Sequence, residues 1–463
     1  MNDDARSKPF RRILVSLVAM VVIVTAAAVV FVPQTSWWGC SHDTDLRSDS
    51  RIDYRREPTD LPSTASDIID QVESLPGVDE FVGGAGLVQD VDSITSGLGD
   101  DIVLSDQQYN ADRSNFRHIS VSPDTATISW DRGQPGEMVA PRLIGDDLVT
   151  FGAVGGDDYR LTALDPADGD VRGCVHIPRD SSDDVGDATL TQSPDDSAVA
   201  VATPDGDSTA LTRIDLESRG RPWTSDLANR SVTRADWYGD VIAVGHLPRS
   251  TDDVATLWNA ADTSDGRTSI TAVDAATGTT AWTWPTRTGD DDTARLATLV
   301  PTVEPTRAFV LAVERVASAD SDEVRLIALD PDSGTEVWSY VSPADDAPVG
   351  DVTAVGDVVL FDSGDRTGAL DAATGTLLWS ESGDPSRNTA GELDATGPQV
   401  WGDQLLVEAE SGGVVVLDAA TGERSGAVEF EPGQSARYWV TEATLTITID
   451  TPEGPYMLVF GRE

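Results

Sequence analysis

The pattern of hydrophobic and polar positions divides the chain into three parts. Residues 13–32 are nearly all apolar and carry no charge, and this run is long enough to span a bilayer as a helix. Residues 63–75 place apolar side chains at helical spacing, and Pro76 and Gly77 end this short predicted helix. From about residue 113 to the C-terminus, short runs alternate between apolar and polar residues, which is the period of β-strands with a buried face.

The alternating part is built on a repeated hairpin with the pattern Ala-x-Asp-x-x-(Thr/Ser)-Gly-x-x-x-Trp. The aspartate can accept hydrogen bonds from backbone amides two or three residues later, and the glycine can adopt the positive φ of a tight turn. The tryptophan on the next strand can wedge between adjacent sheets and donate its indole N–H. We therefore predict a structural, blade-docking role for the best-preserved copies: Asp274, Gly278, Trp282, Asp330, Gly334, Trp338, Asp371, Gly375 and Trp379.

The anchor aspartate recurs in degenerate copies, two of which have Gly173 and Gly426 where the tryptophan is expected. Including Ser122 in the aspartate position of the first copy, seven anchors stand at positions 122, 165, 215, 274, 330, 371 and 418. Their spacing of 41 to 59 residues suits about four short strands, the content of one propeller blade. The sequence therefore predicts an all-β, seven-bladed β-propeller, with eight blades as the alternative because degenerate copies are easily missed.

The strand-like runs at the end of the chain indicate how the propeller ring closes. Two strand-like runs, residues 438–449 and 456–460, follow the last anchor without a further hairpin. The first anchor has only its own hairpin within the repeat region. We therefore expect the C-terminal runs to pair with residues 116–130, which closes the ring and removes exposed sheet edges.

Basic residues before the apolar run and acidic chain after it orient the N-terminus towards the cytoplasm and the propeller outside it. The expected parts are a cytoplasmic tail (1–12), a transmembrane signal-anchor helix (13–32), an extracytoplasmic tether with a small helical segment (33–112) and the propeller (113–463). A cleaved signal peptide is the alternative, because the three alanines at 26–28 resemble a cleavage site. Trp37 and Trp38 disfavour acylation of the nearby Cys40.

Charge narrows the range of partners. The net charge is −48, from 80 acidic and 32 basic residues. Phosphate groups would repel such a surface, so nucleic acid is disfavoured as a partner.

The two cysteines, Cys40 and Cys174, both lie in the part predicted to be outside the cytoplasm, where a disulfide between them can persist. Two free thiols, one of them buried, are the alternative.

Motifs of catalysis and metal binding are not found in the sequence. The four histidines are scattered, and there is no zinc-protease motif, nucleophile elbow or phosphate loop. The acidic clusters at 252–253 and 290–292 have the oxygen ligands that calcium takes, but such pairs are expected by chance in a chain this acidic. We predict no catalytic residue, no cofactor and no metal site.

The repeat resembles the tryptophan-docking motif of the pyrroloquinoline-quinone-like (quinoprotein-type) β-propeller family. It is carried by residues 272–282, 328–338 and 369–379. The resemblance implies two kinds of relative: quinone-dependent dehydrogenases, which bind the quinone with calcium at the propeller axis, and the non-catalytic propeller lipoprotein of the outer-membrane barrel-assembly machinery. The chain lacks the adjacent cysteines of the alcohol dehydrogenases and has no identifiable calcium-ligand set. It is more similar to the second kind.

The function predicted on these grounds is that of a membrane-anchored extracytoplasmic scaffold or envelope assembly factor that binds protein partners of the cell envelope and is not an enzyme. A quinone-dependent dehydrogenase, another ligand-binding propeller and a sensor ectodomain are the alternatives. A long polar insertion, residues 247–267, contains Trp258, which we take as a candidate contact residue.

Overall fold

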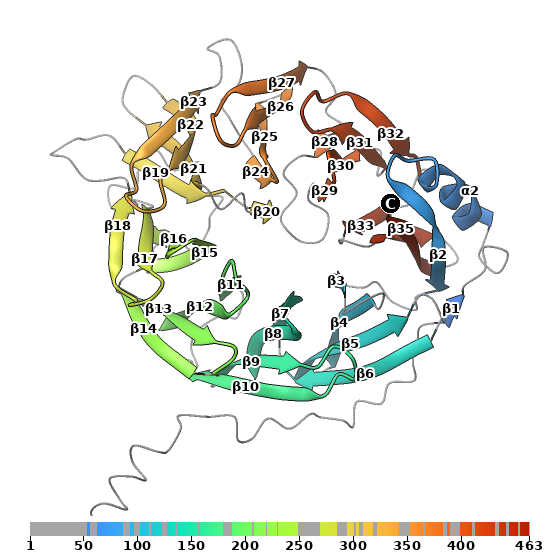
Figure 1. Cartoon of the computed structure of the whole chain (residues 1–463), viewed down its shortest axis with the longest axis horizontal. Coiled ribbons are helices and arrows are strands. Elements are labelled where there is room, and N and C mark those ends of the chain that lie inside the picture. Colours follow the sequence, from blue (N-terminus) through green and yellow to red (C-terminus); the bar gives the residue numbers. More distant parts are fainter. Residues whose placement is uncertain are drawn as a thin grey trace, which may run out of the picture.

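The computed structural model describes twisted β-sheets arranged in a ring around a common centre (Figure 1). The described residues are 53–55, 63–86, 93–96, 102–110, 113–122, 127–135, 137–154, 158–178, 188–205, 208–218, 220–228, 230–248, 269–284, 294–300, 302–304, 309–317, 322–341, 352–363, 366–382, 387–388, 399–409, 413–430, 435–440, 444–451 and 454–462. The all-β propeller predicted from the hairpin repeat is confirmed.

The strands of the described residues form eight sheets, which we number in ring order. Sheet 1 has β3 (Ser93–Ser96), β4 (Ile102–Asn110), β5 (Arg113–Ser122) and β6 (Thr127–Pro135). Sheet 2 has β7 (Glu137–Ile144), β8 (Asp147–Val154), β9 (Asp158–Leu164) and β10 (Val171–Pro178). Sheet 3 has β11 (Thr189–Gln192), β12 (Ala198–Asp205), β13 (Ser208–Asp215) and β14 (Gly220–Ala228). Sheet 4 has β15 (Arg230–Tyr238), β16 (Val241–Pro248), β17 (Ser269–Asp274) and β18 (Thr280–Trp284).

The other half of the ring follows the same plan with additions. Sheet 5 has β19 (Ala294–Leu299), β21 (Val310–Ala317), β22 (Asp322–Leu329) and β23 (Glu336–Val341). Sheet 6 has β20 (Thr302–Glu304), β24 (Val352–Val355), β25 (Val358–Ser363), β26 (Arg366–Asp371) and β27 (Leu377–Ser382). Sheet 7 has β28 (Arg387–Asn388), β29 (Gln399–Trp401), β30 (Gln404–Ala409), β31 (Val414–Asp418) and β32 (Arg424–Val428). Sheet 8 has β33 (Ser435–Val440), β34 (Thr444–Thr451), β35 (Gly454–Arg462), β2 (Val78–Gly86) and β1 (Asp53–Arg55).

Seven of the eight sheets each carry one repeat anchor at the turn between their last two strands, as the hairpin count predicted. Sheet 8 carries no anchor, because it combines strands from both ends of the described chain (Figure 1). This sheet brings the total for the described strands to eight, the number that the sequence left as the alternative to seven.

Ring closure takes place at sheet 8 and not where the sequence predicted it. Strand β35 pairs with β2, and Phe460 lies opposite Phe81. The predicted partner region, residues 116–130, lies instead inside sheet 1, where its β5 part pairs with β4 and its β6 part pairs with β5. The prediction was wrong because two strands precede the first anchor after all, β3 and β4, and residues 93–110 had been assigned to the tether.

The boundary expected at residue 113 therefore moves towards the N-terminus. Strands β2, β3 and β4, which lie before it, are all members of propeller sheets. The helix expected near residues 63–75 is present as α2 (Ser63–Val72). Its apolar face, Ile68, Ile69 and Val72, is buried in one core cluster with sheets 7 and 8, so this segment is part of the ring.

Residues 13–32, Cys40 and Trp258 lie outside the described residues, and so do the acidic clusters at 252–253 and 290–292. Within the described part of the chain, no helix is long and apolar enough to cross a membrane. The transmembrane helix therefore stays a prediction.

Candidate functional site

The repeated turns hold their shape through one carboxylate each. Asp274 Oδ1 accepts hydrogen bonds from the amide and the hydroxyl of Thr277, both at 2.7 Å. The turn at Asp330 uses Ser333 in the same way, at 2.8 and 2.7 Å. The side-chain and backbone hydrogen bonds hold the pKa of Asp274 and of Asp330 below the ordinary value, because they stabilise the ionised form.

Each docking tryptophan joins its own sheet to the next one. Its indole N–H donates to the carbonyl oxygen of the residue after the anchor aspartate of the following sheet. The bonds run from Trp130 to Pro166 (2.7 Å), Trp223 to Ala275 (2.9 Å), Trp282 to Pro331 (2.7 Å), Trp338 to Ala372 (3.1 Å) and Trp379 to Ala419 (3.0 Å). Five of the contacts between neighbouring sheets therefore share one geometry, and Trp130 and Trp223 belong to it although their turns are degenerate in sequence.

Two structural constraints require the glycine of these turns, its backbone conformation and its contact with an indole. At Gly334 φ is +66°, a conformation that side chains with a Cβ rarely adopt. A Cβ there would also lie 2.5 Å from Trp282, because the indole packs flat against the turn. Gly375 has the same relation to Trp338, again at 2.5 Å. The turn, the glycine and the tryptophan thus form one unit that spans two sheets.

Where sheet 7 lacks a tryptophan, helix α2 takes its place. A Cβ on Gly426 would lie 2.7 Å from Leu75 Cδ2, just beyond the end of α2. Gln71 of α2 accepts a hydrogen bond from the amide of Glu429 at 2.8 Å and donates one to its carbonyl oxygen at 3.5 Å. The missing tryptophan at 426 therefore makes room for the segment that joins sheet 7 to the closing sheet.

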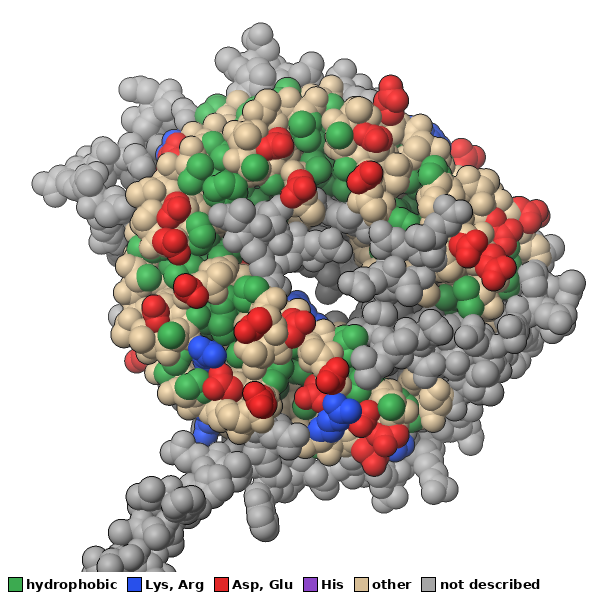
Figure 2. Space-filling view, viewed as in Figure 1, with side chains coloured by type: hydrophobic (Ala, Val, Ile, Leu, Met, Phe, Trp, Pro, Cys, Tyr) green, Lys and Arg blue, Asp and Glu red, His purple; other side chains and the backbone are tan. Residues whose placement is uncertain are grey.

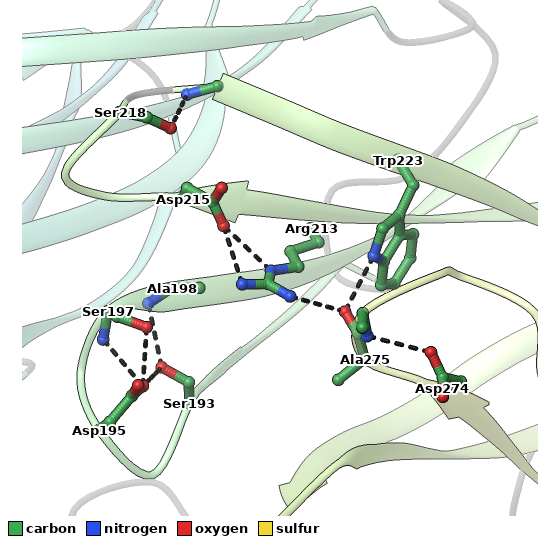
Figure 3. Close-up of polar contacts among 12 residues, drawn as sticks. Ser193, Asp195, Ser197, Ala198, Arg213, Asp215, Ser218, Trp223, Asp274 and Ala275 are labelled. Atoms are coloured by element: carbon green, nitrogen blue, oxygen red, sulfur yellow. Dashed lines mark hydrogen bonds and ion pairs between the residues drawn. The ribbon is translucent and has the colours of Figure 1, made fainter.

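An arginine reinforces the degenerate turn of sheet 3, as Figure 3 shows. Arg213 donates to Asp215 Oδ1 at 3.0 Å within its own sheet and to the carbonyl oxygen of Ala275 in sheet 4 at 2.8 Å. The same oxygen accepts the indole N–H of Trp223. Arg213 also lies over the ring of Trp237, 5.7 Å from its centre. This arginine compensates for a turn that lacks the usual Thr-Gly pair.

One face of the ring carries two sets of tight turns, both rich in acidic residues. The anchor turns lie against the turns between the first two long strands of the same sheet, since the Ala275 amide donates to the Asp240 carbonyl oxygen at 2.8 Å. The equivalent bonds join Ala372 to Asp357 and Ala419 to Asp403. Figure 2 shows acidic side chains distributed around the ring, with few basic ones beside them. Anions are therefore repelled from most of this surface.

The outer strands of sheets 5 and 6 expose large apolar side chains. These side chains, which we call the rim patch, are Val337, Val341, Leu377 and Leu378, with exposed fractions of 48, 47, 43 and 39%. Val337 and Leu378 occupy the same repeat position, directly before the docking tryptophan. Ala281 holds this position in sheet 4 and is also exposed. Strands β23 and β27 end their sheets, so each also presents an unpaired backbone edge.

Charged side chains lie on the inner strands of sheets 2 and 4. Arg234 and Asp236 of β15 form an ion pair with 2.6 Å between Nε and Oδ2. Arg142 of β7 interacts electrostatically with both of them. Burial raises the pKa of Asp236, while Arg234 and Arg142 oppose this rise. No sequence pattern predicted this group, because inner strands cannot be recognised before the sheets are assembled.

Cys174 is fully buried on β10 and is disulfide-bonded. Cys40 is the only other cysteine of the sequence. Among the residues that the structure describes, no group of three or more histidine, cysteine, aspartate or glutamate side chains could hold a metal ion. Of the histidines, His118 and His246 are buried and lie on separate sheets.

The comparison with protein families agrees with the hairpin repeat found in the sequence. Residues 266–454 match the family model described as "Outer membrane protein assembly factor BamB". This match confirms the resemblance to PQQ-like repeat propellers, nearer to the BamB branch than to the dehydrogenases. No curated protein sequence matches the chain.

Several solved structures are similar to this chain at low sequence identity. BamB from Moraxella catarrhalis is 16% identical with a TM-score of 0.42, over 82% of this chain and 96% of that one. The Dos1 propeller is 14% identical with a TM-score of 0.52, over 80% and 92%. The computationally designed Ika8 protein is 12% identical with a TM-score of 0.50, over 81% and 97%. The latter two similarities support the propeller fold and nothing further.

Proposed function

We propose that this protein is a membrane-anchored, extracytoplasmic propeller that serves as a non-catalytic scaffold or assembly factor for proteins of the cell envelope. The match of residues 266–454 to an assembly-factor family model supports this role. The apolar run at 13–32 would supply the anchor, in a single-pass topology with the N-terminus in the cytoplasm.

The observation that carries the proposal is the rim patch. It lies inside the matched span and on two neighbouring outer strands, β23 and β27. These side chains account for all the large exposed hydrophobic residues identified in the described part of the chain. Large apolar side chains exposed on the outer strands of two consecutive sheets are candidates for an interaction surface. A partner segment in extended conformation could pair with the free strand edge and cover the apolar side chains at the same time.

The insertion at 247–267 offers a second contact in this proposal, through Trp258. Both lie outside the described residues, so this contact rests on the sequence alone. Trp258 would act as a large amphipathic contact residue of the kind found at the centre of protein interfaces.

A crosslinking pull-down from the protein's own membranes tests the proposal. The full chain is compared with the variant Val337→Ser/Leu378→Ser and with Ala281→Ser, the equivalent exposed position of sheet 4. Wild type and the Ala281→Ser control should recover the same envelope protein, and the double variant should lose most of it. Wild type that recovers no protein, or a double variant that recovers as much as the control, would refute the rim patch as the docking surface.

A further inference from the structure

The outer rim of the ring carries the N-terminal part of the described chain. Strand β1 pairs with β2 at the outer end of sheet 8, with Tyr54 opposite Ala85. Helix α2 lies beside the outer strand β32 of sheet 7, where the Gln71 side chain accepts a hydrogen bond from the Glu429 amide at 2.8 Å. Cys174 lies on β10, the outer strand of sheet 2, and is buried and disulfide-bonded. The rim therefore has an attachment point for other parts of the chain on each side of sheet 1.

The chain between these two attachment points is short. Cys40 is the only other cysteine of the sequence, and β1 begins at Asp53, thirteen residues later. An extended chain of this length spans at most about 45 Å. Sheet 1 alone separates sheets 2 and 8 in one direction, and five sheets separate them in the other (Figure 1). A disulfide from Cys40 to Cys174 therefore carries residues 41–52, which lie outside the described residues, past sheet 1.

Sheet 1 has an open edge along this path. Its outer strand, β6, pairs with β5 on one side and with no described strand on the other. Figure 1 shows β6 running along the outer circumference, between β10 and the closing sheet. A chain that passes from sheet 2 to sheet 8 would follow the length of β6, and its backbone could pair with the open edge. Residues 53–55 already add to the outer edge of β2 in this manner.

A buried arginine lies beside the disulfide-bonded cysteine. Thr162 pairs with Cys174 across β9 and β10, and Arg160 lies two residues before Thr162. The three side chains share one face of the sheet, which places the Cβ atoms of Arg160 and Cys174 within about 8 Å of each other. This face meets sheet 1, because Leu164, the next residue in the same alternation, packs with Trp130. Arg160 is 6% exposed, and its buried Nε has no hydrogen-bond partner in the described part of the chain.

The partner that this guanidinium lacks is an anion. A buried guanidinium without hydrogen bonds is costly, and a carboxylate relieves the cost through charge-assisted hydrogen bonds. Asp43 and Asp45 follow Cys40 by three and five residues. Disulfide-bonded cysteines have Cα atoms about 4 to 7 Å apart, so both aspartates are close enough in the chain to reach the Arg160 side chain.

We propose that residues 41–52 lie along the outer edge of β6 as an N-terminal strap. A disulfide between Cys40 and Cys174 and an ion pair from one of the two aspartates to Arg160 hold the strap at sheet 2, and β1 holds it at sheet 8. The strap, β1 and α2 then cover the rim from sheet 2 round to sheet 7. The rim patch, on sheets 5 and 6, lies outside this covered part and stays open to a partner. Only this last consequence rests on the proposed function.

Photo-crosslinking within the full chain tests the position of the strap. A photo-reactive amino acid replaces Leu46, midway between Cys40 and β1, and mass spectrometry maps the linked peptides. The unreduced protein should give an adduct with residues 127–135 of β6, and Cys40→Ser should lower its yield at least about tenfold because the local concentration of the strap falls. The same amino acid at Ala281 of sheet 4 should give no such adduct. Adducts of position 46 with other sheets or with another protein, or an equal yield in Cys40→Ser, would overturn the proposal.

The rate of disulfide reduction tests the contact with Arg160. The variant Asp43→Asn/Asp45→Asn removes both candidate partners without changing a residue of the ring. Dithiothreitol should reduce its disulfide at least about tenfold faster than that of wild type, because a strap without the ion pair detaches more often. Asp3→Asn/Asp4→Asn, the same change of charge near the N-terminus, should leave the rate unchanged. Equal rates for all three proteins would refute the ion pair. Neither experiment needs a partner at the rim patch, so this proposal and the proposed function can fail separately.

Discussion

At the scale of single residues, the turn carboxylates show how one side chain can replace several backbone contacts. Asp195, in the turn between β11 and β12, accepts the hydroxyls of Ser193 and Ser197 at 2.7 and 2.8 Å and the amide of Ser197 at 3.2 Å (Figure 3). These bonds lower the pKa of Asp195 to about 2, and the serine hydroxyls contribute most. Short acidic turns of this kind recur around the ring and account for part of its charge.

Asp195 should make stability depend on pH in a defined window. Its folded pKa lies below the ordinary value near 3.9, so its contribution is present above about pH 4 and is lost as the pH falls towards 2. The stability difference between wild type and Asp195→Asn, measured by urea unfolding, should therefore be present at pH 6 and vanish near pH 2. An equal difference at both pH values would contradict the assignment.

Two buried tyrosines allow a matched comparison. Tyr238 has no hydroxyl partner among the described residues, while the hydroxyl of Tyr438 donates to the Leu406 carbonyl oxygen at 3.2 Å. Both side chains are almost fully buried. Tyr238→Phe should leave the free energy of unfolding unchanged or raise it by up to about 1 kcal/mol, because no hydrogen bond to a described residue is lost. Tyr438→Phe should lower it by about 1 kcal/mol in the same urea titration. Equal losses would show that Tyr238 has a partner.

At the scale of elements, the hairpin that recurs in the sequence is also the unit that joins the sheets. Its aspartate, glycine and tryptophan were predictable, because their spacing follows from the turn and from the size of an indole. The substitutes at degenerate copies were not predictable. Arg213 and the helix α2 meet their partners only after distant parts of the chain are brought together, as Gly426 and Leu75 illustrate.

Two glycine substitutions distinguish the cost of backbone strain from the cost of disturbing the docked tryptophan. Gly239→Ala places a Cβ in open space at φ +53°. It should therefore lower the free energy of unfolding only by the backbone strain, about 1 kcal/mol. Gly334→Ala also places a Cβ at positive φ, and in addition it displaces Trp282. It should therefore lower the free energy of unfolding by about 3 kcal/mol. Urea unfolding measures both, and near-ultraviolet circular dichroism should change only for Gly334→Ala. Equal costs at the two positions would mean that the indole does not pack on the turn.

At the scale of the whole molecule, closure is the feature that the sequence misplaced. The segment before residue 113 was predicted to be a tether followed by a small helical part, in which the apolar side chains of Leu87, Val88, Val91, Ile94 and Leu98 are spaced as on a helix. The strands within it are short, and they become recognisable only when β35 offers an edge for β2 and β5 offers one for β4.

The cysteines make a prediction about the N-terminal part of the chain. Cys174 is buried and disulfide-bonded, and we predict Cys40 as its partner. Peptide mass spectrometry of the non-reduced protein should recover the linked pair. Reduction, or Cys40→Ser, should lower the free energy of unfolding by about 2 to 5 kcal/mol. Cys174→Ser is a poor substitute because it also changes a buried position. A free thiol at Cys40 in the unreduced protein would contradict the pairing.

The central claim is that the protein works by binding an envelope protein. Photo-crosslinking from the rim patch is the most direct test of this claim. A photo-reactive amino acid replaces Leu378 in the full chain, in its own membranes, and Ala281 in the matched control. The account predicts one defined protein adduct from position 378 and none from position 281 after irradiation. No protein adduct at 378, or the same adducts from both positions, would contradict it.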